Sequence, residues 1–458
     1  MSAPQGLRAG VPDGAILSRD EAQAIAERVV GMSKADAINV TIGTTYRTNV
    51  RFADNQMSTA GSLADALVGV QSSFGPRHAV VTTNDLSEAA LRRCVEQSEV
   101  LARLAPDDPE AMPELEPQQY ARVDAYMDST VGIDAADRAQ AALTALAPAR
   151  KAGDIKAAGY LVAGAGCTAI ANDKGMFAYH RGTSVNYTLT VRTTDGTGSG
   201  WAGADHPDWR QIDFEAVSLR AIDKARRSAK PSAIEPGRHT VIFEPQAVGD
   251  LAQLIAFYAD ARQADEGRSP FSKPLGGNKV AEKIVDSRVT MYSDPSDAQL
   301  LAQPFDGEGF PIARQVWIEN GVLKQLQYSR FWAKKQNKPP TGGATSLKMA
   351  GGSATMDEMI RSTDRGILVT RLWYLREVDP RTILYTGLTR DGTFLIEEGR
   401  ITRSISNLRF NESPLFMLNN LEMLGPSERL AGTEAGGSVA MPALKVRDFN
   451  FTSLSEAV

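Results

Sequence analysis

The sequence predicts an α+β protein: an N-terminal α/β layer domain, residues 1–232, followed by a C-terminal domain dominated by antiparallel β-sheet, residues 233–458. In the first half, segments with helical spacing of apolar residues alternate with strand-like segments. The second half carries the turn signals of β-hairpins. Proline and glycine gather in Pro231–Gly237, which marks the expected boundary. A chain of 458 residues is long enough for two or three domains.

The first expected helix opens at Ser18, where Glu21 completes a capping box, and runs to about Met32. A second helix begins around Asp85–Glu88, because the apolar residues after it recur at helical spacing. Strands are expected between these helices, at Ala37–Tyr46, Val50–Phe52, Ala64–Phe74 and His78–Thr82.

A proline-rich, acidic surface connector is expected at Pro106–Pro117. Helices follow at Ala135–Lys151 and Phe214–Ser228. The glycine-rich run Gly196–Gly200 does not lead into a helix with a lysine, so it is a poor phosphate-binding loop. Further strands are expected at Gly159–Ala165, Cys167–Asn172, Phe177–His180 and Asn186–Thr194.

In the C-terminal half, Asn320-Gly321 and Asp391-Gly392 indicate hairpin turns, since these pairs readily take positive φ; Glu398-Gly399 is a further turn. Pro340–Ala354 is rich in glycine, threonine and serine and is expected to be a long mobile loop. The apolar segment Phe410–Leu424 fits two roles: a dimer interface in the C-terminal domain, or part of the chain's own core.

Composition excludes several classes. The formal net charge is -5, and the short basic cluster Lys224–Arg227 suits the last turn of a helix, so we expect no nucleic-acid partner. The two cysteines, Cys94 and Cys167, form no disulfide framework and are expected to be buried. No apolar run reaches the roughly 20 residues of a membrane span, and Met1–Gly14 has no signal core. We therefore expect a cytoplasmic protein with no membrane contact.

The four histidines, His78, His180, His206 and His239, form no close pair of metal ligands. Asp205-His206-Pro207-Asp208 could be a polar site, but a loop with a solvated histidine is the expected arrangement.

Five stretches carry a family resemblance: Pro304–Pro311, Val316–Leu323, Ser329–Lys335, Pro340–Gly343 and Pro442–Phe451. Their Asp-x-Glu-Gly run, followed by Ile-Glu-Asn-Gly-Val-Leu, is similar to the hallmark of the TldD/TldE (PmbA) family of zinc-dependent proteases. The resemblance is clear over Arg238–Thr452 and weaker in the first half. It implies the two-domain fold given above.

The protease-active subunits of that family carry His-Glu-x-x-x-His where a strand runs into a helix. The matching positions here are Pro245, Gln246 and Asp250. Proline offers no donor atom, an amide is not a base, and one aspartate makes a weak zinc site. We expect Asp250 to be a solvated or capping carboxylate in the first turn of a helix. The family's third ligand, a cysteine, has no counterpart in Leu430–Val446.

The resemblance therefore indicates a TldE/PmbA-like chain with no catalytic residue, metal ligand or cofactor of its own. It implies a TldD-type catalytic partner that carries His-Glu-x-x-x-His and the zinc, and an extended peptide substrate held by strand addition. The loop Pro340–Ala354 would be a gate, and dimerisation is expected through the C-terminal domain. Two alternatives stay open: a stand-alone enzyme with another site, and a stand-alone peptide-binding or scaffolding homodimer.

Overall fold

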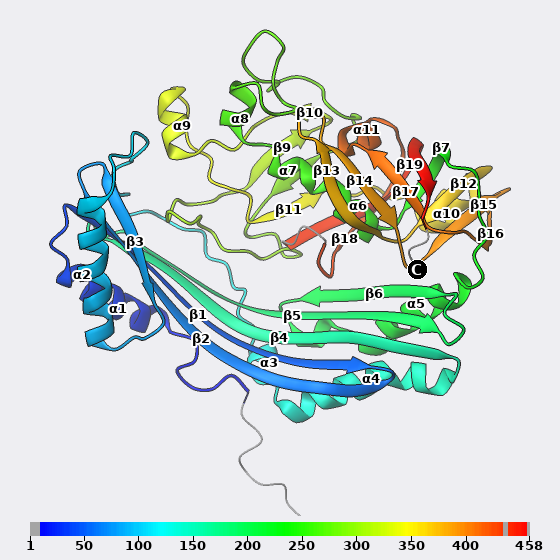
Figure 1. Ribbon diagram of the computed structural model, residues 1–458, viewed down its shortest axis with the longest axis horizontal. Helices are drawn as coiled ribbons and strands as arrows, with labels where there is room; N and C mark the ends of the chain where they lie inside the picture. Colours follow the sequence, from blue (N-terminus) through cyan, green and yellow to red (C-terminus); the bar gives the residue numbers. More distant parts are fainter. Residues whose placement is uncertain (1–9, 434–437, 456–458) are drawn as a thin grey trace, which may run out of the picture.

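The computed structural model describes residues 10–433 and 438–455, and it places two β-structures one above the other (Figure 1). A long, curved sheet from the N-terminal half lies below a more compact β-rich domain from the C-terminal half. This is the predicted α+β fold, with an α/β layer first and antiparallel sheet second. The expected boundary at residues 232 and 233 falls between the last helix of the first half and the first strand of the second.

The N-terminal sheet has six strands in the order β3-β2-β1-β4-β5-β6, and every neighbouring pair is antiparallel. The strands are β1 (Ala37–Ala53), β2 (Gln56–Phe74), β3 (Arg77–Thr83), β4 (Ile155–Asn172), β5 (Phe177–Thr193) and β6 (Ser199–His206).

Several of these strands are longer than the sequence predicted. The expected strands Ala37–Tyr46 and Val50–Phe52 are one strand, β1, and the segments expected on either side of Gly166 are one strand, β4. Of the polar residues between the two expected strands, Arg47 and Asn49 lie on the less buried face of β1, while Thr48 continues the buried face with Val50. The ladder is therefore unbroken, with Arg47 paired to both neighbouring strands.

One face of this sheet is covered by helices. α1 (Arg19–Met32) and α2 (Glu88–Leu104) cover one end, while α4 (Ala135–Ala152) and α5 (Phe214–Arg227) cover the other. The capping box of Ser18 and Glu21 is present as predicted. The short helices α3 (Asp128–Val131) and η2 (Trp209–Gln211) lie near α4 and the end of β6. The opposite face of the sheet faces the C-terminal domain (Figure 1).

The C-terminal domain is built on a 13-stranded sheet, in which two strand pairs, β7 with β12 and β11 with β19, are parallel. Its central strands β7 (Gly237–Phe243) and β19 (Ser438–Leu454) pair along much of their length. The other strands are β8 (Met291–Ser293), β9 (Gln315–Glu319), β10 (Val322–Leu323), β11 (Ser346–Met349), β12 (Arg365–Val369), β13 (Leu372–Asp379), β14 (Leu384–Thr389), β15 (Thr393–Glu397), β16 (Arg400–Ser404), β17 (Leu408–Glu412) and β18 (Leu421–Arg429). Its helices are α6 (Pro245–Ala252), α7 (Leu254–Phe257), α8 (Ala261–Asp265), α9 (Arg330–Lys335), α10 (Met356–Arg361) and α11 (Pro414–Asn419).

The predicted turns have positive φ at Asn320, Asp391 and Glu398. Asn320 and Glu398 join paired strands, β9 with β10 and β15 with β16. Asp391 does not, because β14 pairs with β13 and β17 while β15 pairs with β12 and β16. The turn at Asp391 is therefore a connection between different parts of the sheet.

The burial of side chains corrects the expectation for Pro340–Ala354 and decides between the two roles of Phe410–Leu424. The supposed loop Pro340–Ala354 contains β11, whose Leu347 and Met349 are buried between β8 and β19. In the segment Phe410–Leu424, Phe410, Met417, Leu418 and Leu421 are buried in the core of the C-terminal domain, and Phe416 is exposed. This segment therefore forms part of the chain's own core.

Candidate functional site

The junction of β7 and α6 carries Pro245, Gln246 and Asp250, the positions that the resemblance matches to the family's zinc motif. β7 is an inner strand between β19 and β12, and Glu244 donates its N–H to the Val369 carbonyl at 3.0 Å as the strand ends. α6 starts at Pro245, in the first turn of the helix, where a missing N–H costs nothing. Apart from Pro245, which is half-buried, every residue of this helix is buried. The junction is thus a rigid, enclosed part of the domain.

Gln246 and Asp250 lie one turn apart on α6 and contact each other. The Gln246 amide donates to Asp250 Oδ1 at 3.3 Å and to the Gly432 carbonyl at 2.7 Å. Asp250 Oδ2 accepts the Leu372 N–H at 3.3 Å, and Asp250 is only 1% exposed. The expectation of a solvated or first-turn capping carboxylate is wrong: Asp250 is the sixth residue of α6 and joins the helix to the start of β13.

The segment that should carry the third zinc ligand lies directly against α6. An added Cβ at Gly249 would come within 2.1 Å of Leu430 Cδ1, so glycine is what allows this close approach. The fold therefore brings the described end of this segment, at Leu430, against the helix that carries Gln246 and Asp250. Residues 434–437 of the segment lie outside the described residues. The donor set does not fit zinc, because Pro245 has no donor and Gln246 is an amide that already donates. Among residues 10–433 and 438–455, no group of three or more histidine, cysteine, aspartate or glutamate side chains could hold a metal ion.

Two contacts beside this junction tie the domains together, and neither was predicted from the sequence. Lys224 of α5 pairs with Glu244 at 2.5 Å. Asp391, 2% exposed in its side chain, pairs with Arg371 at 3.2 Å and accepts from Ser199 Oγ at 2.6 Å. These contacts fix the junction relative to the N-terminal sheet.

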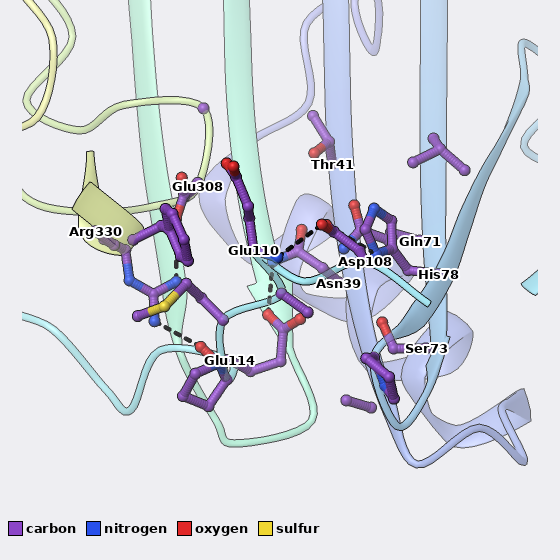
Figure 2. A pocket seen from close by; sticks show the side chains of 18 of the residues that line it. Asn39, Thr41, Gln71, Ser73, His78, Asp108, Glu110, Glu114, Glu308 and Arg330 are labelled. Carbon is purple, nitrogen blue, oxygen red and sulfur yellow. Dashed lines mark hydrogen bonds and ion pairs between the residues drawn. The ribbon is translucent and has the colours of Figure 1, made fainter. Parts of the chain in front are cut away.

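A groove of about 820 Å³ lies between the two domains at the end of the sheet near α1 and α2. Its floor is the helix-free face of the sheet, including Asn39, Gln71 and Ser73. One wall is the connector Asp108–Glu114, and the other is formed by Gly307–Glu308 and Ser329–Phe331 of the C-terminal domain. Figure 2 shows the connector carboxylates beside the polar floor, with Glu308 and Arg330 on the far side.

The groove is lined by more acidic than basic side chains. Four lining carboxylates, Asp108, Glu110, Glu114 and Glu308, face one arginine, Arg330. Arg330 bonds Glu308 at 3.0 Å and the Pro113 carbonyl at 2.5 Å, which holds the connector against the C-terminal domain. The acidic surplus suits a ligand with basic or amino groups. A cavity of about 180 Å³ shares Glu308, Ser329 and Arg330 with the groove, and the loop residues Pro340, Gly342 and Gly343 line it.

The sequence treated Pro106–Pro117 only as a connector, so it missed this groove. Its acidic character was visible, but its position between the two domains depends on long-range contacts. One is the pair of Glu110 with Arg262 at 2.8 Å, and another is the bond from Asn39 to Glu114 at 3.1 Å.

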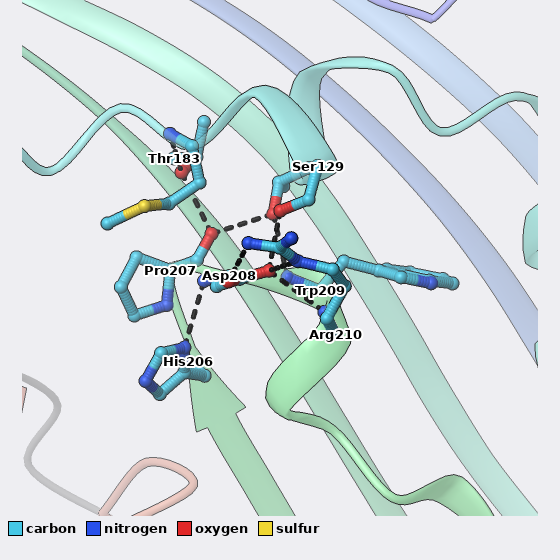
Figure 3. Close-up of polar contacts among 9 residues, drawn as sticks. Ser129, Thr183, His206, Pro207, Asp208, Trp209 and Arg210 are labelled. Atoms are coloured by element: carbon cyan, nitrogen blue, oxygen red, sulfur yellow. Dashed lines mark hydrogen bonds and ion pairs between the residues drawn. The ribbon is translucent and has the colours of Figure 1, made fainter.

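The polar segment Asp205–Asp208 is ordered rather than a solvated loop. His206 ends β6, and its Nδ1 accepts the Asp208 N–H at 2.9 Å (Figure 3). Asp208 pairs with Arg210 at 2.8 Å and accepts from Ser129 at 2.5 Å, contacts that hold its pKa well below the usual range. These bonds join β6 to α3 and η2, so the cluster has a structural role.

The remaining reactive side chains are those of the two cysteines and the other three histidines. Cys94 and Cys167 are buried, as predicted, and burial raises the pKa of the Cys94 thiol. Burial lowers the pKa of His180. His78 lies 3.8 Å from Asp108 in the groove, and His239 bonds the Glu235 carbonyl at 3.1 Å. No helix in the described parts of the chain is long and apolar enough to cross a membrane.

Comparisons with known proteins agree with this fold. Three family domains match: PmbA/TldA metallopeptidase domain 1 over residues 40–102, the central domain over 125–229 and the C-terminal domain over 236–453. The chain belongs to the PmbA/TldD/TldE family of metalloprotease-like proteins.

Relatives cover different shares of the chain. A metalloprotease of Methanothermobacter thermautotrophicus is 28% identical over 236 residues, 48% of this chain and 49% of the relative. This match spans about half of the relative's length. The metalloprotease PmbA of Escherichia coli O157:H7 is 22% identical over 435 residues, 90% of this chain and 92% of the relative.

Solved structures share the fold along almost the whole chain. TldE from Thermococcus kodakarensis has a TM-score of 0.84 at 19% identity, covering 94% of this chain and 99% of that chain. A putative modulator of a DNA gyrase from Thermotoga maritima has a TM-score of 0.83 at 17% identity, covering 94% and 100%.

Proposed function

We propose that this chain is the non-catalytic, zinc-free subunit of a cytoplasmic TldD/TldE-type metalloprotease that trims or degrades peptides and unfolded proteins. The observation that carries the proposal is the bonded and buried pair of Gln246 and Asp250, at the positions that the resemblance matches to the family's general base and a zinc ligand. Neither side chain can activate water as paired here: the amide is not a base, and the carboxylate is tied to Leu372 and Gln246.

The zinc and the glutamate base would come from a TldD-type partner carrying His-Glu-x-x-x-His. This chain would wall the chamber and hold extended substrate for the partner's zinc. The groove supports this role, because it lies between the two domains and is lined by polar groups and carboxylates from both. Pro340, Gly342 and Gly343 line its neighbouring cavity. The part of Pro340–Ala354 that precedes β11 is therefore the candidate gate.

Reconstitution with a His-Glu-x-x-x-His homologue tests the subunit role. We expect cleavage of unfolded peptides by the mixture and none by this chain alone. Gln246→Ala here should leave the rate within about twofold, because an amide supplies no general-base catalysis. Replacing the partner's glutamate by glutamine should abolish cleavage. Strong cleavage by the isolated chain would refute the proposal.

The groove is tested by removing two of its carboxylates. Because Glu110 and Glu114 also hold the connector through Arg262 and Asn39, amide exchange of residues 108–114 checks that the variant keeps the connector in place. Glu110→Gln with Glu114→Gln should weaken binding of a fluorescent lysine-rich peptide by about threefold to tenfold at low salt. A matched control, Glu96→Gln with Glu215→Gln, removes the same charge from exposed helix positions away from the groove. Equal affinity in both variants would place the peptide elsewhere.

The alternative is a stand-alone peptide-binding or scaffolding homodimer. This homodimer would bind peptide in the same groove, and one experimental outcome distinguishes it from the subunit role. It predicts peptide binding with no complex and no cleavage when the homologue is added.

A further inference from the structure

A second hollow lies on the helix-free face of the N-terminal sheet, at the end near α4 and opposite the groove (Figure 1). It has a volume of about 490 Å³, and residues of β1, β2, β4 and β5 line it. Its polar groups are the Arg51 guanidinium, the Tyr160 hydroxyl and the hydroxyls of Ser58, Thr59, Thr188 and Thr190. None of the described residues that line it is acidic. The hollow therefore suits a ligand group with a negative charge.

Arg51 presents its charge to this hollow without a carboxylate partner. Its guanidinium lies over the Tyr160 ring, 5.5 Å from the ring centroid, and forms no ion pair within the described parts of the chain. Both side chains are exposed. Asp54, the acidic residue nearest to Arg51 along the chain, pairs with Lys156 at 2.9 Å. A guanidinium stacked on an aromatic ring keeps its N–H donors available for a carboxylate.

The acidic groove and this hollow lie on the same face of one strand. Asn39 of the groove floor and Arg51 of the hollow both belong to β1, which pairs with β4 from Asn39 to Phe52 without a break in register. Their neighbours Val40 and Val50 are buried in the clusters under the helices. At about 3.3 Å per residue, the two positions are about 40 Å apart along the strand.

The middle of this face leaves room for a chain and adds no net charge. Arg47 of β1 and Asp65 of β2 lie on it, one charge of each sign. Gly43 and Gly69 lie on it as well, and an added Cβ at either would have no atom closer than 3.8 Å. A bound backbone can therefore approach the sheet closely between the two ends.

We infer that an extended peptide lies along this face with its amino end in the acidic groove and its C-terminal carboxylate on Arg51. The two ends of the face select this direction, because a reversed chain would bring its carboxylate to the four groove carboxylates and its amine to Arg51. The distance selects a length of about 12 residues for a peptide that reaches both ends. A polyanion along the face does not fit, because the groove would repel it.

This inference rests on the proposed function, since it takes an extended peptide as the ligand, and it adds the direction and length that the chain prefers. Its readout is binding by this chain alone, whereas the subunit role is read by cleavage with a partner. Cleavage by the reconstituted pair, with no effect of the peptide's end groups on binding, would refute the inference and leave the subunit role standing.

The test is fluorescence anisotropy of the full chain with a peptide of about 12 glycine, serine and threonine residues that carries a neutral fluorophore at its centre. At low salt, the peptide with free ends should bind about threefold to tenfold more tightly than the same peptide amidated at its C-terminus. Acetylation of the amino end should weaken binding by a similar factor. In a peptide of half this length, which reaches only one end at a time, blocking either end alone should matter less than about twofold.

Substitution at Arg51 locates the carboxylate. Arg51→Gln should remove the effect of amidation and keep the effect of acetylation. The matched control, Arg93→Gln at an exposed position of α2 away from the hollow, should change neither. Circular dichroism checks that both variants keep the fold.

Four results would overturn the inference. One is no binding of the free peptide by the wild-type chain at millimolar concentration, and another is equal binding of the free and amidated forms. The third is an amidation effect that persists in Arg51→Gln and disappears in Arg47→Gln. The fourth is an amidated peptide ending in glutamate that binds as tightly through Arg51 as the free peptide, which would assign the hollow to acidic side chains.

Discussion

Replacing Asp250 by alanine tests whether this buried carboxylate is a structural tie or the remnant of a metal ligand. The substitution removes the acceptor of the Leu372 N–H and one of the two acceptors of the Gln246 amide, at a position 1% exposed. A buried donor left unpaired costs about 1–3 kcal/mol, and the small void adds about 1 kcal/mol. We therefore expect a loss of about 2–4 kcal/mol in unfolding free energy.

Urea denaturation followed by tryptophan fluorescence gives this number, because Trp317, Trp332 and Trp373 all lie in the C-terminal domain. Asp250→Asn keeps the size and one oxygen, so it should lose only about 1 kcal/mol. A loss under about 0.5 kcal/mol for Asp250→Ala would refute the structural role, since surface changes have effects of that size. Release of bound zinc on the same substitution would refute the absence of a metal site.

Three further changes follow from local geometry. Gly249→Ala should lower the free energy of unfolding by about 1–3 kcal/mol in a urea melt, because the added Cβ would lie 2.1 Å from Leu430 Cδ1. The control Gly31→Ala in α1, where nothing lies within 4 Å of the added Cβ, should be neutral or stabilising. Arg288 holds the pKa of Asp286 down to about 2, so this pair stabilises the fold above the unfolded pKa near 4, and the contribution is lost as pH falls towards 2. Asp286→Asn should therefore cost about 1 kcal/mol at pH 7 after solvent screening, and nothing near pH 2; an equal loss at both pH values would contradict this cause. Restoring the motif with Pro245→His, Gln246→Glu and Asp250→His should give at most weak zinc binding by calorimetry, because no cysteine or histidine lies in residues 430–446.

Local signals in the sequence predicted the helices well. The capping box at Ser18 and the apolar spacing of residues 135–151 and 214–228 each depend on neighbours within a few turns, and α1, α4 and α5 follow them closely. Each long strand was predicted as two shorter ones, because polar residues on an exposed face resemble a turn when the partner strand is unknown. β1 continues through Arg47 because β2 and β4 pair with it there.

The strand–helix junction at Phe243–Asp250 was predicted in position, but its surroundings were not. That this junction has lost the family's zinc donors stays a prediction. The burial of Asp250 could not be predicted, because its partner Leu372 is 122 residues away. The groove was missed for the same reason: its floor, connector wall and far wall come from residues near 39–82, 108–114 and 307–331.

The zinc content of the purified complex tests the central claim most directly. Elemental analysis of this chain with a His-Glu-x-x-x-His partner should give about one zinc per pair of chains, and this chain alone should hold none, because its own junction lacks donor atoms. Alanine at the partner's two histidines should remove the metal completely. One tightly held zinc per copy of this chain in isolation would contradict the account.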